Sequence, residues 1–270
     1  MRRLLKDLAP PILVRTFHSI AGGGISFRGD FATWDAACAA STGYDSEEIL
    51  LRTRAAALKV KHGEAGMDRD GVAFDRVEFS FPVIAALLRG ACARGGDLTV
   101  LDFGGGLGTS YRQFRAFGAK LQRLRWRVVE QPRMVAAGRE LFESAELRFF
   151  SSPAEALREG KPDVVLLSSV LQYLRDPYFL LEELAALKGA ILVIDRTPCS
   201  ESSRDVLSVQ TVPSRIYRGS YPCWIFSRGK LESALSRRHS LRASFRDSAG
   251  ALRGDDGEFV LQGYVLEPKS

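Results

Sequence analysis

Short apolar runs alternate with amphipathic stretches through the middle of this 270-residue chain. Apolar runs of about four to eight residues are typical of buried strands, and apolar positions three or four residues apart are typical of helices packed on a sheet. The predicted strands cover residues 98–102, 125–130, 147–150, 163–168 and 190–195. Regular alternation of strands and helices predicts a parallel sheet with helices on both of its faces.

Capping signals mark the predicted helices between these strands. Residues 152–155 form a capping box with proline at the first helical position, and Asp176-Pro177 begins a helix that Gly189 ends. Further helices are predicted at residues 109–118 and 228–237. Two alternating segments, 241–245 and 259–266, flank a Gly-Asp-Asp-Gly turn and predict a closing antiparallel pair.

The sequence divides into an N-terminal extension, residues 1–78, and a main domain, residues 79–270, with an insertion at 197–226. The extension contains two helical patterns, at 33–40 and 45–58, and a polar, glycine-punctuated loop at 59–78 that we interpret as a lid. A helix at 81–93 then packs on the sheet. Residues 1–20 join basic and apolar side chains without the apolar core of a signal peptide. They fit a peripheral membrane helix, and equally a packed or disordered segment.

The strand at residues 98–102 ends in the pattern D-x-G-x-G-x-G, formed by Asp102, Gly104, Gly106 and Gly108. A dinucleotide motif would need glycine where Thr109 stands, so the pattern indicates S-adenosylmethionine and not NAD. Glycines let a ligand approach the backbone amides, although a strand-to-helix turn can need glycine for packing alone.

An acidic residue follows at the end of the next predicted strand. Glu130 lies 22 residues after Gly108, close to the separation of about 20 residues that is typical of a carboxylate binding ribose hydroxyls. The alternative is a carboxylate that ends a strand and faces solvent. Together, the glycines and Glu130 describe one βαβ unit with a nucleoside site at its carboxyl edge.

These features resemble the class I S-adenosylmethionine-dependent methyltransferases over about residues 79–267. The resemblance rests on DFGGGLG at 102–108, Glu130, SSVLQYL at 168–174 followed by Asp176-Pro177, and IDRTP at 194–198. With VVEQP and SYPCWIFS, these motifs are similar to a bacterial family of methyltransferases associated with surface-polysaccharide loci. The resemblance implies a Rossmann-like fold with a seven-stranded, mostly parallel sheet and an antiparallel C-terminal strand.

The resemblance also implies the residues that contact the cofactor. Asp102 would face the methionine ammonium, and Glu130 would hold the ribose hydroxyls. The other implied positions are Gly104, Gly105, Gly106, Gly108, Gln131, Ser168, Ser169 and Val170. After the third strand this class commonly has an acid against adenine, whereas this chain has Ser151 and Ser152. Adenine recognition would therefore use a hydroxyl, with Ser151 as the candidate, or backbone groups.

Methylation of a hydroxyl group also needs a base near the acceptor. Candidates at the carboxyl ends of strands are Asp195 as base, Tyr173 as base or positioning group, and Arg196 as a clamp on an anionic substrate. The insertion carries aromatic candidates for binding a sugar or a planar ring, namely Tyr217, Tyr221 and Trp224. The same aromatic side chains would suit a hydrophobic core under a long loop equally well.

Composition places this chain in a reducing compartment, and we expect a cytoplasmic enzyme. Its four cysteines are widely spaced, and its three histidines form no cluster with carboxylates, so we expect neither disulfides nor a metal site. The net charge of +6 comes from arginines spread along the chain, which is typical of a solvated surface and also favours acidic partners.

Three other functions can be weighed against a small-molecule methyltransferase. A short-chain reductase is a poor alternative because no tyrosine is followed by lysine at Y-x-x-x-K spacing. An RNA cytosine methyltransferase would use Cys199 as its nucleophile, but no cysteine stands beside Ser168 and no RNA-binding module is present. A non-catalytic protein that binds the cofactor is the third alternative. We expect O-methylation of a small-molecule or glycan acceptor, such as a sugar or glycolipid intermediate, with no nucleic-acid partner.

Overall fold

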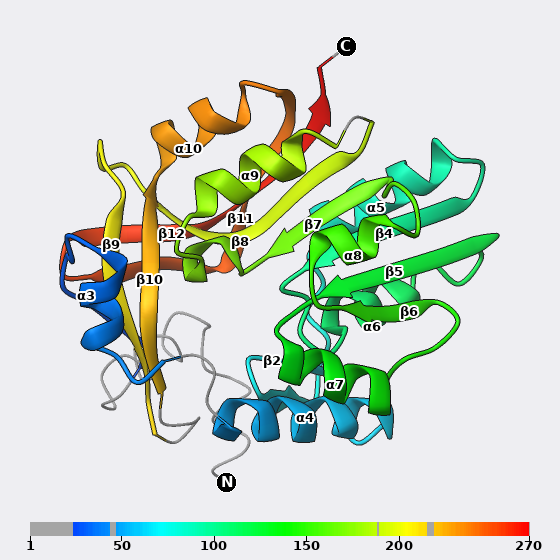
Figure 1. Ribbon diagram of the computed structural model, residues 1–270, viewed down its shortest axis with the longest axis horizontal. Helices are drawn as coiled ribbons and strands as arrows, with labels where there is room; N and C mark the ends of the chain where they lie inside the picture. Colours follow the sequence, from blue (N-terminus) through cyan, green and yellow to red (C-terminus); the bar gives the residue numbers. More distant parts are fainter. Residues whose placement is uncertain (1–23, 44–46, 188, 215–218, 270) are drawn as a thin grey trace, which may run out of the picture.

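A ten-stranded sheet, three strands larger than the predicted seven, forms the centre of the computed structural model, which describes residues 24–43, 47–187, 189–214 and 219–269. Seven of its strands, in spatial order, are β6 (Leu147–Phe150), β5 (Arg123–Val129), β4 (Asp97–Phe103), β7 (Val164–Ser168), β8 (Ile191–Ser200), β12 (Gly257–Pro268) and β11 (His239–Gly254). The first five pair in parallel, and β12 runs antiparallel to both β8 and β11. The predicted Rossmann-like α/β fold is confirmed, including its closing antiparallel pair (Figure 1).

Helices cover both faces of this sheet. The helices are α5 (Phe81–Cys92), α6 (Thr109–Arg115), α7 (Pro132–Leu141), α8 (Pro153–Leu157), α9 (Pro177–Ala185), α10 (Arg228–Leu235) and the short 3-10 helix η1 (Leu171–Tyr173). Neighbouring strand residues point to opposite faces: Val100 packs in the core under α5, α6 and α7, whereas Leu101 packs in the core under α8, α9 and α10. Continuous apolar runs are therefore buried on both sides, as the sequence predicts.

The insertion adds strands to the sheet. β9 (Val206–Val212) and β10 (Gly219–Ser227) pair antiparallel, and β1 (Ser26–Arg28) pairs with the free edge of β9. β10 also pairs with the end of β8 at Cys199 and Ser200, beyond the last residue of β7. The helix α3 (Trp34–Ala39) packs on this added sheet, at the left of Figure 1. The N-terminal extension is therefore part helical and part strand.

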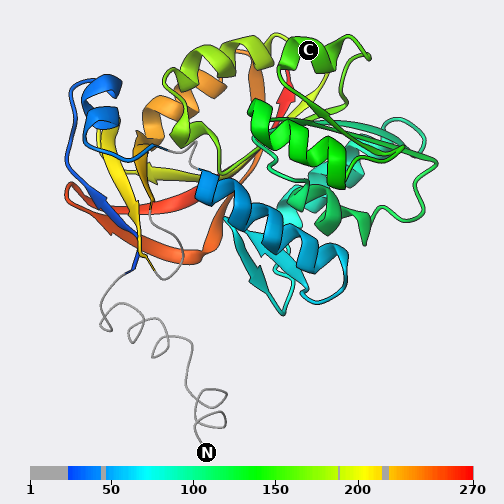
Figure 2. The ribbon, with the colours of Figure 1, turned by 60° about the horizontal axis from the view of Figure 1, so that its bottom comes forward.

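The segment predicted as a loop at residues 59–78 is instead partly ordered secondary structure. α4 (Glu47–Lys61) extends into it, and β2 (Met67–Arg69) and β3 (Val72–Phe74) form a hairpin beside α4 (Figure 2). The turn residues Asp70 and Gly71 both have positive φ, of 49° and 75°. Asp-Gly is a favoured two-residue hairpin turn. The membrane contact predicted for residues 1–20 and the first residues of the capping box at 45–48 lie outside the described residues.

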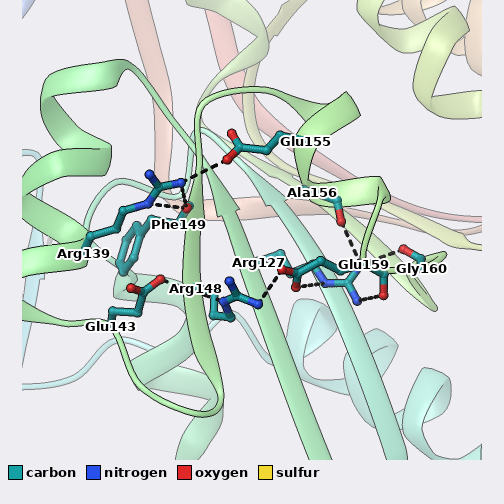
Figure 3. A network of polar contacts seen from close by, with 9 residues as sticks. All are labelled: Arg127, Arg139, Glu143, Arg148, Phe149, Glu155, Ala156, Glu159 and Gly160. Atoms are coloured by element: carbon teal, nitrogen blue, oxygen red, sulfur yellow. Dashed lines mark hydrogen bonds and ion pairs between the residues drawn. The ribbon is translucent and has the colours of Figure 1, made fainter.

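An arginine network ties β5 and β6 to the helices beside them (Figure 3). Arg127 on β5 is 3% exposed and donates to the carbonyl oxygens of Ala156, Glu159 and Gly160, at and just beyond the end of α8. Arg139 on α7 donates to the Phe149 carbonyl at 2.8 and 3.0 Å. Charged donors at a helix end satisfy carbonyls that have no partner within the helix. The network therefore ties the end of α8 to β5 and ties α7 to β6.

We expect Arg127→Met to lower the free energy of unfolding by about 2–4 kcal/mol, because it removes charge-assisted hydrogen bonds from a buried guanidinium to three backbone carbonyls. Chemical denaturation monitored by circular dichroism measures this. Arg148→Met is the matched control: its side chain is 50% exposed and pairs with Glu143 and Glu159, so its loss should be below about 1 kcal/mol. Equal losses in the two variants would contradict the assignment.

Candidate functional site

A cavity of about 310 Å³ opens at the carboxyl edge of the parallel strands. Its floor is formed by the turn after β4 and by the ends of β5, β7 and β8. Its walls come from the β2–β3 hairpin, the start of α5 and the middle of β11. The residues lining the floor include Gly104, Gly105, Gly106, Glu130, Ser168, Ser169, Asp195 and Arg196. Open α/β sheets bind ligands at this edge, and this volume lies at the lower end of the range for ligand pockets.

The glycines of the turn after β4 have two different structural roles, close packing and space for a ligand. A Cβ atom at Gly104 would lie 2.3 Å from Val170 Cγ2, and one at Gly105 would lie 2.5 Å from the Asp102 carboxyl. Packing therefore explains these two glycines. Gly106 has a φ of 57°, lines the cavity, and would have no atom within 4 Å of its Cβ. Its bare face leaves room for a ligand beside the backbone.

Asp102 lies beneath this turn and does not line the cavity. It is fully buried, and its Oδ2 accepts a hydrogen bond of 2.9 Å from the Trp126 indole N–H. Its Oδ1 is buried and has no hydrogen-bond partner among the described residues. Burial raises the pKa of Asp102 to about 7, against the hydrogen bond from Trp126, and the charge of Glu130 adds to the increase. A direct contact between Asp102 and a ligand ammonium stays a prediction.

Glu130 borders the cavity and is hydrogen-bonded to the turn. Its Oε1 accepts from the Gly106 amide at 3.2 Å, and its Oε2 accepts from the Gln131 amide at 2.8 Å. Burial raises its pKa, while these two backbone hydrogen bonds oppose the increase. Gln131 and Ser151 are exposed and are not among the lining residues, and the Ser151 amide donates to Glu155. A role for these two residues in binding stays a prediction.

Asp195 is on β8 and is 6% exposed. It lines the same cavity as Glu130. The Ser168 hydroxyl donates to its Oδ2 at 2.9 Å, and the Ser80 hydroxyl donates to its Oδ1 at 3.4 Å. Burial raises the pKa of Asp195, while Arg196 and the Ser168 hydroxyl lower it. A buried carboxylate with a raised pKa at a cavity wall is suited to accepting a proton.

The backbone beside Asp195 is strained at two positions. Ser169 and Arg196 have φ values of 55° and 51°, which side-chain-bearing residues rarely adopt. The Arg196 guanidinium lies 3.7 Å from Asp195 Oδ2, and its Nε is buried without a hydrogen-bond partner in the described part of the chain. Such strain persists where the surroundings impose it, often at functional sites. Both of these strained residues line the cavity.

The predicted aromatic candidates lie elsewhere. The Tyr173 hydroxyl donates to Gln210 at 3.0 Å, and its ring packs against Tyr221 at 5.2 Å between ring centroids. Trp224 stacks on Trp34 and donates its indole N–H to the Leu174 carbonyl. Neither Tyr173, Tyr221 nor Trp224 lines the cavity; they pack in the core of the added sheet. Tyr217 lies outside the described residues.

The hairpin contributes residues that the sequence did not indicate. Asp68 is 3% exposed and accepts hydrogen bonds from the Thr109 hydroxyl at 2.8 Å and from Arg112 at 2.5 Å. Arg69, the next residue, lines the cavity. The Asp-Gly turn was the available signal for a hairpin. Its position over the start of α6 depends on tertiary contacts that no local pattern reveals.

Cys199, the candidate nucleophile of the RNA-modifying alternative, is buried in β8 and does not line the cavity. Burial raises its pKa to about 12, so the thiolate is disfavoured. Within the described ranges, no group of three or more His, Cys, Asp or Glu residues is placed to hold a metal ion. No helix in that part of the chain combines the length and apolar character needed to cross a bilayer.

No protein-family model and no curated protein matches the chain. Among solved structures, the N-terminal domain of EvdMO1, crystallised in the presence of SAH and D-fucose, is 18% identical; 84% of this chain and 98% of that chain are covered, with a TM-score of 0.49. The 1,6-didemethyltoxoflavin-N1-methyltransferase of Burkholderia thailandensis is 16% identical, with 90% and 93% covered and a TM-score of 0.45. An S-adenosylmethionine-dependent methyltransferase from Clostridium acetobutylicum is 10% identical, with 82% and 100% covered and a TM-score of 0.48.

The buried Asp102 carboxyl makes stability depend on pH. Its pKa is raised in the folded chain, so the folded state binds more protons and the free energy of unfolding falls as pH rises from about 4 to about 7. We expect Asp102→Asn, which cannot ionise, to raise the free energy of unfolding at pH 8 by about 2–4 kcal/mol, with little effect at pH 4. Denaturant unfolding of both proteins at these two pH values measures the difference. A stability gain that is the same at both would rule out the titration of Asp102 as its cause.

Proposed function

We propose that this protein is a methyltransferase that uses S-adenosylmethionine to methylate a hydroxyl group of a small molecule. The observation that carries the proposal is a single cavity bordered by Gly106 and Glu130 on one side and by Asp195 and Arg196 on the other. The first pair is suited to a nucleoside and the second to an acceptor that loses a proton.

The residues on the first side fit the cofactor. The Glu130 carboxylate can accept both ribose hydroxyls, and its hydrogen bond from the Gly106 amide holds it beside the turn. A side chain at Gly106 would project into the cavity. The carboxyl ends of β4, β5 and β7 thus present backbone without side chains at Gly106. Beside it lies the Glu130 carboxylate, which can accept hydrogen bonds from ribose.

When bound, S-adenosylmethionine supplies a methyl group whose bond to the positively charged sulfur breaks as the acceptor oxygen bonds to the carbon, and the electron pair leaves with the sulfur. Asp195 takes the proton of the acceptor hydroxyl onto a carboxylate oxygen. Ser168 and Ser80 hold that carboxylate in place, at 2.9 and 3.4 Å. In-line displacement depends strongly on positioning, which these hydrogen bonds provide.

We further propose a sugar or glycolipid intermediate as the acceptor, with Arg196 binding an anionic group on it. A guanidinium with a buried, unpartnered Nε gains most from a carboxylate or phosphate. The link to surface polysaccharides comes from the sequence resemblance alone. The exposed aromatic Phe81 at the cavity wall supplies a surface for a sugar ring or an acyl chain.

We expect Glu130→Ala to weaken S-adenosylmethionine binding by about 10- to 100-fold, which corresponds to about 1.5–3 kcal/mol for charge-assisted hydrogen bonds to ribose. Gly106→Val should weaken it at least as much, because the valine side chain occupies the space beside the turn and is strained at a φ of 57°. Calorimetric titration measures both. Glu140→Ala, which removes a 65% exposed carboxylate on α7, is the control. Binding of NAD with no response to S-adenosylmethionine would overturn the proposal.

The base assignment predicts a pH profile. Asp195 must be ionised to act, and its pKa is raised by burial, so kcat/KM should fall with acidification at a pH above the ordinary carboxyl range. Asp195→Asn should reduce kcat by about 100- to 10,000-fold with cofactor affinity nearly unchanged, and should abolish this acid limb. Cys199→Ser is the matched control and should retain turnover. Turnover lost only in proportion to unfolding would remove Asp195 from the mechanism, and turnover lost in a folded Cys199→Ser variant would favour the cysteine-nucleophile alternative.

A further inference from the structure

Arg69 is a second cation at the cavity, besides Arg196, with a donor that no described residue accepts. Arg69, on β2, lines the cavity, and its Nε is buried without a hydrogen-bond partner. Its Nη1 pairs with Glu78 at 3.2 Å, but the Glu78 side chain is 64% exposed. An exposed pair of this kind contributes little. The guanidinium of Arg69 therefore keeps a donor without an acceptor beside the cavity that the residue lines.

The position of Arg69 relative to the glycine turn is fixed by its neighbour. Asp68 accepts from the Thr109 hydroxyl, at the first residue of α6, and from Arg112. Arg112 in turn donates to the carbonyl of Leu107 within the turn at 2.7 Å. Because Arg112 neutralises the charge of Asp68, the buried carboxylate does not cancel the charge of Arg69.

The groups around the cavity indicate which anion the Arg69 guanidinium would bind. Glu130 follows β5 and accepts from the Gly106 amide, whereas Arg69 follows Asp68, which accepts from the Thr109 hydroxyl at the start of α6; both Glu130 and Arg69 line the cavity. A cofactor with its ribose at Glu130 and its sulfur beside Gly106 brings its amino-acid end to the Arg69 side. That end carries a carboxylate, for which guanidinium is the best-matched partner.

We propose that Arg69 binds the α-carboxylate of the methionine portion of the cofactor. This inference rests on the proposed function and goes beyond it, because it assigns the β2–β3 hairpin to cofactor recognition. Arg196 is assigned to the acceptor instead, because it lies next to Asp195, whose Oδ2 is 3.7 Å from its Nε. The hairpin thus recognises the part of the cofactor that distinguishes it from a simple nucleoside.

The test compares two ligands that differ only at this end. S-adenosylhomocysteine contains the carboxylate, and 5′-methylthioadenosine has the same adenosine and sulfur without the amino-acid group. Calorimetric titration should show that Arg69→Met weakens S-adenosylhomocysteine binding by about 10- to 100-fold and changes 5′-methylthioadenosine binding by less than about twofold. Arg69→Lys, which keeps the charge but lacks the Nε donor, should give an intermediate loss for S-adenosylhomocysteine.

Arg52→Met is the matched control: Arg52 pairs with Glu48 on α4 and contacts the hairpin turn at Gly71, but does not line the cavity. It should leave both affinities unchanged. Equal weakening of both ligands by Arg69→Met would show that Arg69 only supports the hairpin and would overturn the proposal. A selective loss in Arg196→Met instead would do the same. If the unmodified protein binds neither ligand, the proposed function itself fails.

Discussion

The site depends on the burial of one carboxylate, that of Asp102, under the turn between β4 and α6. The Trp126 indole holds one of its oxygens, and the Asp102 carboxyl leaves no room for a side chain at Gly105. The bare turn then approaches Val170 after β7, and its Gly106 amide meets Glu130 at the end of β5. Three strand ends are thereby held in one arrangement by contacts of a few ångströms.

Local sequence patterns were sufficient to predict the parallel strands and most of the helices that cover them. Ser152 caps α8 by accepting from the Glu155 amide, and Asp176 caps α9 by accepting from the Phe179 amide, as their sequence patterns predict. The strands of the insertion could not be predicted in this way. β9 pairs with β1 near residue 27 of the chain, and pairing over such a separation leaves no local pattern. For the same reason, Tyr221 and Trp224 could be either substrate-binding or core residues.

The cavity was predictable where it depends on the topology of the sheet. The carboxyl ends of parallel strands meet at one edge, so Glu130, Ser168 and Asp195 could be grouped from sequence alone. The residues that the hairpin contributes could not be predicted from the sequence. Asp68 and Arg69 are positioned by the hydrogen bonds that Asp68 accepts from Thr109 and Arg112. Tyr173 was predicted to lie at the cavity because it follows the end of β7. Its ring instead packs against Tyr221 on β10.

The insertion of β12 between β8 and β11 has a consequence for biosynthesis. A chain emerging from the ribosome can pair β4, β5, β6 and β7 early, but the edge of β8 from Leu192 to Cys199 gains its partner β12 only when residues 257–268 have been made. Until then the edge of β8 is open, with apolar side chains such as Val193 beside it. The glycine turn and Glu130 thus belong to the part of the molecule that can form first during translation, whereas the strand carrying Asp195 is completed last.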